Sequence, residues 1–379
     1  MYYYREMREL IEKYGSRYSD KPRTAMIRMI FWNLLYIFKG SKDSGSGVRG
    51  RWNAEWMEKE YASMMQKYSM LYGDAVNYLH SRLLEKEKEQ YMLKIRWNKQ
   101  VIPDGEAVHI VFITDNAYAF PTSIAISSIT YHCNPAVDYR IHVIGVDLED
   151  EMKQMLIKSG KRVDCIETSE CQCDVDFTHE HVSKAALFKF KIADLFPDYD
   201  KILYLDSDMI VLNDLSELYR TDIEGKYGAA VTDYHIAKKG YRGLSQIKTK
   251  HYFNSGMLLM NLEEMRKHYL PQKLLSKKKE ISKNTVFSFM DQDTFNIICG
   301  DKMLLLSVKY NFLNCYYEEM ERYEMHKLTG IDFEEICRIY ERPTVLHIGG
   351  KYKPWKGILG EKRLLYDKYM LINRLYREI

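Results

Sequence analysis

Apolar and polar residues alternate along the middle of the chain in a way that predicts strands and helices in turn. The runs HIVFIT (109–114), YRIHVIGV (139–146) and RVDCIE (162–167) are rich in β-branched residues and typical of short buried strands. Between them, residues 123–133 and 151–160 repeat apolar residues at helical spacing. This alternation predicts an α/β fold in which the sheet is largely parallel.

The two ends of the chain lack this alternation. Residues 25–38 are apolar nearly all round and have helical length, and GSKDSGSG (40–47) is typical of a flexible linker. Residues 52–98 mix apolar residues with alternating charges, as in a helical hairpin, and residues 361–379 form an amphipathic helical pattern. We expect the helices at 25–38 and 361–379 either to pack on the body of the protein or to lie on a membrane surface.

These patterns divide the chain into five parts. The parts are an N-terminal helical segment (1–40), a flexible linker (41–51), a helical hairpin (52–104), an α/β catalytic domain (105–356) and a C-terminal amphipathic helix (357–379). The turn Pro103-Asp104-Gly105 marks the boundary after which the alternating strand and helix patterns begin.

Composition narrows the class of protein. With 379 residues, 46% of them hydrophobic and 29% charged, the chain can bury a sizeable core, which excludes global disorder. The net charge is only +3 and the basic excess lies in the first third, which suggests an anionic partner such as a membrane surface and no nucleic acid. The start MYYYREMREL lacks the apolar centre of a signal peptide, and residues 25–38 are fewer than the roughly 20 that span a bilayer. We therefore expect a cytoplasmic protein that can contact the inner membrane face peripherally.

The seven cysteines do not indicate a disulfide framework or a zinc ribbon. They are scattered, and no pair of CxxC elements occurs. Cys171 and Cys173, followed by His179 and His181, resemble a metal cluster in composition, but their spacing fits no standard zinc pattern.

The sharpest chemical signal is KILYLDSDMIVL, in which a buried strand ends in Asp206 and Asp208. Ligands of open α/β sheets gather at the carboxyl ends of strands, and two acids among apolar residues are costly without a cation. Hard carboxylate oxygens suit Mg²⁺ or Mn²⁺, often shared with substrate phosphates. Taken alone, however, an Asp-x-Asp can simply end a strand and cap a turn.

Three later segments carry further polar groups. Asn254-Ser255-Gly256 precedes an apolar run, Asp291-Gln292-Asp293 precedes a helical run, and His347 is followed by Gly349-Gly350 and Lys353. Small residues with an amide suit a polyhydroxyl ligand, whereas an imidazole, a Gly-Gly bend and a lysine suit a metal ion and a phosphate. Each segment taken singly also has a purely structural explanation.

In this order along the chain, the segments resemble glycosyltransferase family 8. The resemblance covers about 109–356 and rests on HIVFITDNAYAFPTSIAISS, KILYLDSDMIVLNDL, YFNSGMLLMNL, DQDTFN and LHIGGKYKPW. It implies a GT-A-like, Rossmann-like, mostly parallel sheet flanked by helices, with an added N-terminal helical region. It also implies a retaining, metal-dependent hexosyltransferase that uses a nucleotide sugar, as do bacterial lipopolysaccharide glycosyltransferases.

The resemblance also implies roles for individual residues. Nucleotide contacts would come from Ile113, Thr114, Asp115, Tyr118, Gly350 and Lys353, with Tyr118 on the uracil and the last two on the diphosphate. The metal ligands for Mn²⁺ or Mg²⁺ would be Asp206, Asp208 and His347. Sugar contacts would come from Lys189, Asp233, Asn254, Ser255, Asp291 and Gln292, of which Gln292 would lie near the anomeric carbon.

Two positions depart from the family pattern. Ala117 stands where the family usually has Asn, which removes one nucleotide contact, and Lys189 stands where the family tends to have Arg. Lysine keeps the charge of arginine but loses its planar fork of donors. Neither departure affects the three metal ligands.

For the mechanism, we expect the acceptor to attack from the same face as the leaving UDP, since Gln292 is a poor nucleophile; Asp291 is the alternative, as a covalent nucleophile. The donor would be a UDP-hexose, with glucose or galactose favoured, and the acceptor a hydroxyl of a glycan, a lipid-linked sugar or a protein. Rival interpretations are a non-catalytic nucleotide-sugar-binding or scaffold protein and a nucleotidyltransferase. The basic, aromatic segment 241–252 is expected to form a loop over the site.

Overall fold

The computed structural model describes residues 84–85, 87–169, 184–249, 251–282, 287, 289–313, 322–350, 353–356 and 361–379. The N-terminal helical segment, the linker, most of the helical hairpin and the Cys171–His181 cluster lie outside these residues. The chain divides into two compact units, residues 1–89 with 359–365 and residues 90–358 with 366–379. In the first unit, the described residues are helical (84–85, 87–89 and 361–365). Everything below concerns the second unit.

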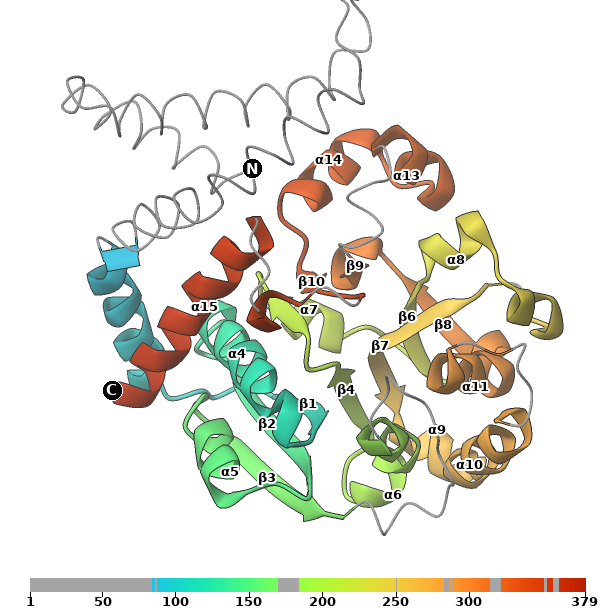
Figure 1. The fold of residues 1–379 in the computed structure, drawn as a ribbon, viewed down its shortest axis with the longest axis horizontal. Coiled ribbons are helices and arrows are strands. Elements are labelled where there is room, and N and C mark those ends of the chain that lie inside the picture. Colours follow the sequence, from blue (N-terminus) through green and yellow to red (C-terminus); the bar gives the residue numbers. More distant parts are fainter. Residues whose placement is uncertain are drawn as a thin grey trace, which may run out of the picture. The chain divides into compact units, whose positions relative to one another are not determined.

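A seven-stranded sheet forms the centre of the second unit, in the order β3-β2-β1-β4-β7-β6-β8 (Figure 1). Its strands are β1 (Ala107–Thr114), β2 (Asp138–Val146), β3 (Val163–Thr168), β4 (Lys201–Leu205), β6 (Gly228–Thr232), β7 (Phe253–Asn261) and β8 (Met303–Leu306). Only β7 runs against its neighbours β4 and β6, while the other pairs are parallel. The predicted α/β fold with a largely parallel sheet is therefore confirmed.

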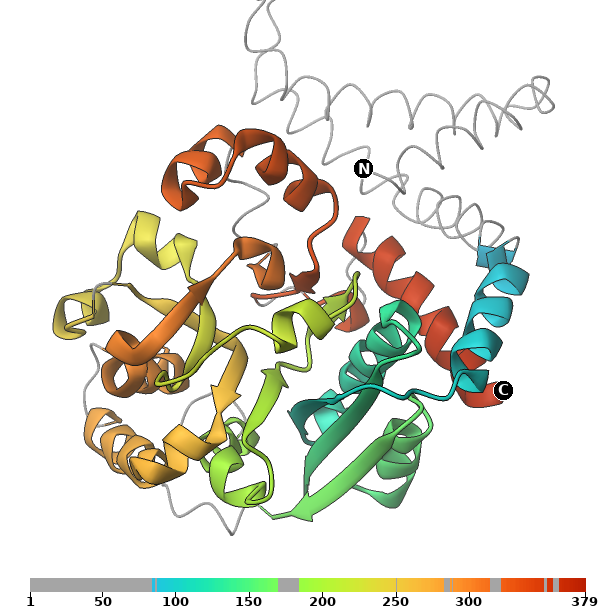
Figure 2. The same ribbon diagram turned by 180° about the vertical axis from the view of Figure 1, so that it is seen from behind.

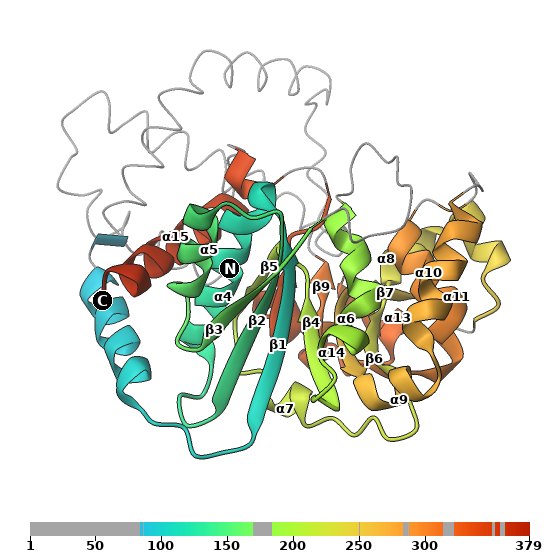
Figure 3. The same cartoon turned by 90° about the horizontal axis from the view of Figure 1, so that it is seen from below.

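Helices accompany both halves of the sheet. Residues 90–100 are helical. The later α-helices are α4 (Asn116–His132), α5 (Asp150–Ile157), α6 (Ile192–Leu195), α7 (Ser216–Tyr219), α8 (Tyr234–Lys239), α9 (Leu262–Lys267), α10 (Leu270–Ile281), α11 (Met290–Cys299), α13 (Arg322–Thr329), α14 (Phe333–Glu341) and α15 (Glu361–Glu378). The 3₁₀ segments are η3 (Lys184–Lys191), η4 (Arg242–Gln246), η5 (Gly300–Lys302), η6 (Val308–Tyr310) and η7 (Pro354–Lys356). Figure 3 shows α4 and α5 beside β1–β3, and α9, α10 and α11 beside the β6–β7 half.

The first strand shows why its sequence forms a central strand. Successive side chains of a strand point to opposite faces, yet Ile110, Val111 and Phe112 are all fully buried. Val111 joins a core cluster with side chains of η3, β7 and α9–α11, so layers of side chains cover the sheet here. A strand covered on both faces has no polar side to alternate with, which explains the continuous apolar run.

A second, three-stranded sheet has the order β5-β10-β9, with β5 at Met209–Val211, β9 at Phe312–Leu313 and β10 at Val345–His347. Strand β10 is antiparallel to β5, with His347 opposite Met209, and parallel to β9, with His347 opposite Leu313. Three segments far apart in the sequence therefore meet at this small sheet.

The Asp291-Gln292-Asp293 cluster does not precede a helix, as predicted, but forms its first turn, because α11 begins at Met290. The carboxylate of Asp293 accepts a hydrogen bond from the Phe289 N–H (3.0 Å), and the Asp293 N–H donates to the Phe289 carbonyl (2.6 Å). Acidic side chains stabilise the unpaired N–H groups in the first turn of a helix. The helix therefore begins before the acidic residues and includes them.

The described part of the C-terminal helix packs on the body. Its Asn373 side chain donates to the Ser123 carbonyl (3.0 Å) and the Ser127 hydroxyl (2.8 Å) of α4, and Tyr369 is 1% exposed. Figure 2 shows this red helix beside the green α4. Among the described residues, no helix combines the length and the apolarity needed to cross a bilayer.

Burial of His132 predicts a loss of stability in acid. Its Nε2 lies 2.8 Å from the Tyr369 hydroxyl, and burial, followed by the positive charges of Lys94, Arg342 and Lys368, lowers the pKa of His132 to about 3. The unfolded chain takes up this proton near pH 6.5, so the contribution to stability is complete above that pH and declines as the pH falls toward the folded-state pKa. Between pH 7.5 and 5.5 the loss from this group is about 1.4 kcal/mol. Urea unfolding of the wild type and of His132→Gln at both pH values measures it. A pH-dependent loss equal in the two proteins would contradict the assignment.

Candidate active site

Two carboxylates stand at the end of β4, on a turn held by hydroxyl groups. The Ser207 hydroxyl donates to the Ile113 carbonyl (3.2 Å), and the Thr122 hydroxyl lies 2.8 Å from Ser207 and 3.0 Å from Thr114. These bonds tie the middle of the Asp-Ser-Asp turn to the carboxyl end of β1. Both flanking aspartates are thereby held at the sheet edge where ligands of α/β folds bind.

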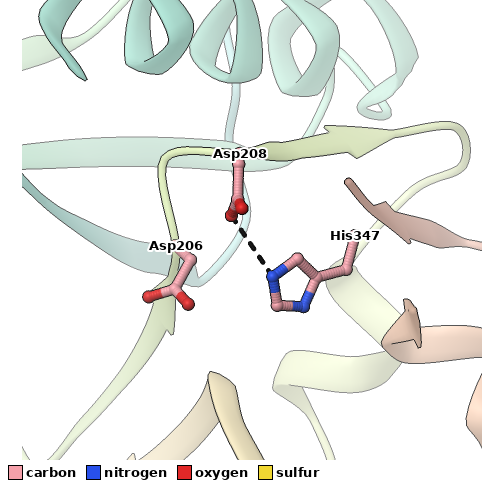
Figure 4. A group of neighbouring side chains, drawn as sticks. All are labelled: Asp206, Asp208 and His347. Atoms are coloured by element: carbon pink, nitrogen blue, oxygen red, sulfur yellow. Dashed lines mark ion pairs between the residues drawn. The ribbon is translucent and has the colours of Figure 1, made fainter. Parts of the chain in front are cut away.

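Asp206, Asp208 and His347 converge (Figure 4). One potential ligand atom from each lies within 4.8 Å of those of the other two, and the His347 Nε2 is 3.2 Å from the Asp208 Oδ1. The histidine reaches the acids because β10 pairs with β5, and the Ile348 N–H extends this pairing by donating to the Asp208 carbonyl (2.9 Å). The structure thus brings together the three residues that the resemblance marks as metal ligands.

Space for an ion is left by Gly256 of β7. A Cβ at this position would lie 2.6 Å from the His347 Cε1 and 2.8 Å from the Asp206 Oδ2, closer than real Cβ contacts. Any other residue would therefore displace two of the three candidate ligands. We call the space between Gly256, Asp206 and His347 the cradle. A donor set of two carboxylates and an imidazole around this cradle fits a divalent cation such as Mn²⁺ or Mg²⁺.

The two acids differ electrostatically. Burial raises the pKa of Asp206, and the nearby Lys189 offsets only part of this effect. Burial alone would also raise the pKa of Asp208, but the His347 imidazole and the Lys353 ammonium outweigh it and hold the pKa below its ordinary value. The Lys353 Nζ lies 2.5 Å from the Asp208 Oδ2 and 2.6 Å from the Ile348 carbonyl. Asp208 is therefore the firmly ionised member of the pair.

Lys189 of η3 bridges the acid pair and α11. Its Nζ lies 2.9 Å from the Asp291 Oδ2, 3.1 Å from the Ser255 carbonyl and 3.4 Å from the Asp206 Oδ1, and its side chain is 2% exposed. An ammonium group has three N–H donors, and these three oxygens match them. Lys189 accordingly holds Asp206 and Asp291 in position, and contact with a sugar would require one of these bonds to be exchanged.

The other residues expected to contact a sugar form one hydrogen-bonded group, the sugar-side cluster: Asp233, Asn254, Ser255, Asp291 and Gln292. The Gln292 amide accepts from the Ser255 N–H (3.1 Å) and donates to the Asp233 Oδ2 (3.1 Å), while the Asn254 amide donates to the same oxygen (3.3 Å). The Ser255 hydroxyl donates to Asp291 (3.1 Å). Strand β7, the N-cap of helix α8 and the first turn of helix α11 supply these side chains, so regular elements hold them.

The residues expected to bind the nucleotide lie at the end of β1 and after β10. Asp115 caps α4 by accepting from the Tyr118 N–H (3.0 Å), and the Tyr118 ring lies edge-to-face with Trp355, with centroids 6.1 Å apart. Gly350 has a positive φ of 75°, a conformation that glycine adopts without strain. By contrast, Ile113 and Thr114 are 7% and 1% exposed, so their side chains face the interior and any contact with a nucleotide would involve their backbone.

Several residues of the site escaped the sequence reasoning. The Tyr204 hydroxyl donates to Asp206, Ser207 anchors the acid turn, and Asn311 accepts from the His347 Nδ1 (2.9 Å). Asn311 is 1% exposed and precedes β9, with no neighbouring polar motif to mark it. The only available signal was a polar residue directly before a short apolar strand.

A mostly parallel sheet with an Asp-x-Asp turn and a histidine at its edge is the arrangement of a GT-A fold. A solved structure of the galactosyltransferase LgtC with donor and acceptor sugar analogues shows this fold, with a TM-score of 0.58 and 20% identity over 70% of this chain and 95% of LgtC. The chain belongs to glycosyl transferase family 8, whose family model matches residues 109–358.

Named relatives agree with this family. Glycosyltransferase GlyF of Streptococcus pneumoniae is 30% identical over 258 residues, which cover 65% of this chain and 56% of GlyF. Lipopolysaccharide 1,2-glucosyltransferase of Escherichia coli K12 is 25% identical over 286 residues, 73% of this chain and 81% of that enzyme. Residues 109–358 therefore form a glycosyltransferase domain, as predicted.

Replacement of Gly256 by alanine tests the cradle. The added methyl group would lie against His347 and Asp206, so we expect Mn²⁺ binding and sugar transfer to fall by about 100-fold or more while the fold is retained. Gly105→Ala is the matched control, because the nearest atom to its Cβ is 3.9 Å away. Titration of Mn²⁺ by electron paramagnetic resonance measures the effect. Equal affinity in the two variants would rule out the cradle.

Proposed function

We propose that the protein is a retaining hexosyltransferase that moves glucose or galactose from a UDP-sugar to a hydroxyl group, with a divalent cation as cofactor. The observation that carries this proposal is the convergence of Asp206, Asp208 and His347 beside the sugar-side cluster. A cation site next to polar groups suited to sugar hydroxyls is what cleavage of a sugar–diphosphate bond requires.

The leaving group determines which charges are needed. Cleavage of the bond from the anomeric carbon to the diphosphate leaves negative charge on the UDP. A divalent cation held by Asp206, Asp208 and His347 would act there as a Lewis acid. Lys353 supports the same role, because its buried ammonium lies against Asp208 and can donate to a phosphate oxygen placed beside it. Tyr118 and Asp115 at the end of β1 would orient the nucleoside.

Retention of configuration is assigned to attack from the face of the leaving group. Gln292 is an amide whose two polar atoms are already bonded to Ser255 and Asp233. Asp291 is hydrogen-bonded to Lys189 and Ser255; although burial favours its neutral form, these partners lower its pKa overall. A carboxylate restrained and stabilised in this way is a weak nucleophile. The acceptor proton would then pass to an oxygen of the departing UDP.

The substrates and the cellular location of the enzyme are further parts of the proposal. The likeness to a lipopolysaccharide glucosyltransferase supports a hexose donor and an acceptor hydroxyl on a glycan, a lipid-linked sugar or a protein. As part of the same proposal, the enzyme acts in the cytoplasm and contacts the inner membrane face where its acceptor requires it.

A donor panel tests the cofactor and the donor together. We expect UDP release from UDP-glucose or UDP-galactose with Mn²⁺, its loss with EDTA, and at least about a 100-fold decrease in Asp208→Asn, because the firmly ionised ligand is removed. Asp214→Asn is the control, since this carboxylate bonds Ser216 and Tyr139 outside the site. Undiminished UDP release in EDTA would contradict the metal dependence, and no release from any UDP-sugar would contradict the transferase.

Asp291 separates the two mechanisms. We expect Asp291→Asn to retain measurable transfer, decreased about 10- to 100-fold because Lys189 loses a partner, and external azide not to restore it. Asp293→Asn is the matched control, because this carboxylate lies in the same turn but faces Tyr241 and Tyr252. Mass spectrometry of acid-quenched protein incubated with donor alone completes the test. A hexose adduct on Asp291, or rescue by azide, would establish a covalent route.

A further inference from the structure

One buried chain of hydrogen bonds leads from a backbone N–H to the imidazole of His347. The Gly256 N–H donates to the Asn254 Oδ1 (3.0 Å), and the Asn311 Nδ2 donates to the same oxygen (2.8 Å). The Asn311 Oδ1 in turn lies 2.9 Å from the His347 Nδ1. Asn254, Asn311 and His347 are 8%, 1% and 6% exposed, so water has little access to these bonds.

The direction of every bond in this chain follows from its first donor. A backbone N–H can only donate, so the atom of Asn254 that faces Gly256 must be the oxygen. The group of Asn311 that faces this oxygen must be the NH₂, which turns the Asn311 carbonyl toward His347. An acceptor at that point requires the proton of the neutral imidazole to be on Nδ1. Nε2 is then the nitrogen directed toward the acid pair, 3.2 Å from the Asp208 Oδ1, and its lone pair is the one that a bound cation would use.

The same amide group also joins the two halves of the site. Asn254, which orients Asn311, donates through its Nδ2 to the Asp233 Oδ2, and Gln292 donates to that oxygen as well. A rotation of the Asn311 amide would place its carbonyl against the Asn254 Oδ1 and its NH₂ against the His347 Nδ1. The contact between the two amide oxygens would be unfavourable whatever the tautomer of His347, so Asn311 has one orientation in which Asn254 is satisfied.

We propose that Asn311 is a positioning residue that fixes the tautomer of His347, so that Nε2 is available to a divalent cation, and that links this cation site to the sugar-side cluster. The proposal rests on the proposed function for the identity of the cation. Partners of this kind orient metal-binding histidines in other proteins, where their loss costs 10- to 100-fold in metal affinity. Its effect on metal binding is exerted through His347.

Two substitutions separate the two sides of Asn311. Asn311→Leu keeps the approximate volume but removes both hydrogen bonds. Asn311→Asp keeps an acceptor for the His347 Nδ1. Its second oxygen replaces the NH₂ group that donates to the Asn254 Oδ1 (2.8 Å), so this hydrogen bond is lost and two oxygens face each other. Asn373→Leu is the matched control, because Asn373 is equally buried (1% exposed) and bonds Ser123, Ser127 and Ser159 instead.

The experiment measures Mn²⁺ binding to the full-length, EDTA-treated protein and the tautomer of His347 by ¹⁵N NMR of histidine-labelled protein. We expect Asn311→Leu to bind Mn²⁺ about 10- to 100-fold more weakly and to move the proton of His347 to Nε2, facing Asp208. Asn311→Asp should restore most of the Mn²⁺ affinity but raise the KM for the UDP-sugar, because only its sugar side is disrupted. Asn373→Leu should lower the unfolding temperature without changing Mn²⁺ affinity.

Other results would overturn the proposal. These are an unchanged Mn²⁺ affinity in Asn311→Leu, an equal loss in Asn373→Leu, or a wild-type His347 whose Nδ1 carries no proton. The NMR measurement needs no metal, so it tests the role of Asn311 even if the wild type binds no Mn²⁺. Absence of Mn²⁺ binding in the wild type would contradict the proposed function. Failure of the proposed function and failure of the role of Asn311 are therefore distinguishable.

Discussion

The pairing of β10 with β5 is the interaction on which the site depends. Its register places His347 opposite Met209, directly after Asp208, and the Ile348 N–H adds a bond to the Asp208 carbonyl (2.9 Å). The residues that make this pairing stable are apolar and buried, among them Ile210 and Val345. Burial of these apolar side chains stabilises the pairing, and the register of the paired strands determines where the imidazole of His347 lies. A slip of one residue would turn His347 to the opposite face of the small sheet.

The charges around this pairing explain why the site suits a cation. Three partly buried carboxylates, of Asp206, Asp208 and Asp291, form a cluster with the two buried ammonium groups of Lys189 and Lys353. Burial of ionised groups is costly, and each lysine offsets the cost for its immediate partners. The remaining negative charge is close to His347 and the space above Gly256, which is where a divalent ion would complete the balance.

Much of this organisation was predictable from local pattern. The strands at 109–114, 139–146 and 162–167 correspond to β1, β2 and β3. The continuous apolar runs of β1 and β2 are typical of strands buried on both faces, whereas β3 lies at the edge of the sheet and is only partly buried. The family resemblance identified the chemistry-bearing residues, and their side chains do come together. The predicted boundary of helix α11 was wrong, since the acidic residues that were expected to precede the helix form its first turn. The roles predicted for single residues remain proposals.

The sequence by itself determined the class of fold, the family and which side chains carry charge at the strand ends, because these depend on short-range periodicity and on motifs that are read directly. Only the tertiary structure decided what those side chains bond to. Tyr204, Ser207 and Asn311 carry no motif, and Lys189 looked like a substrate contact until its Nζ was found among Asp291, Ser255 and Asp206. Hydrogen bonds depend on distance and direction between segments far apart in the chain, and those quantities exist only once the strands have paired.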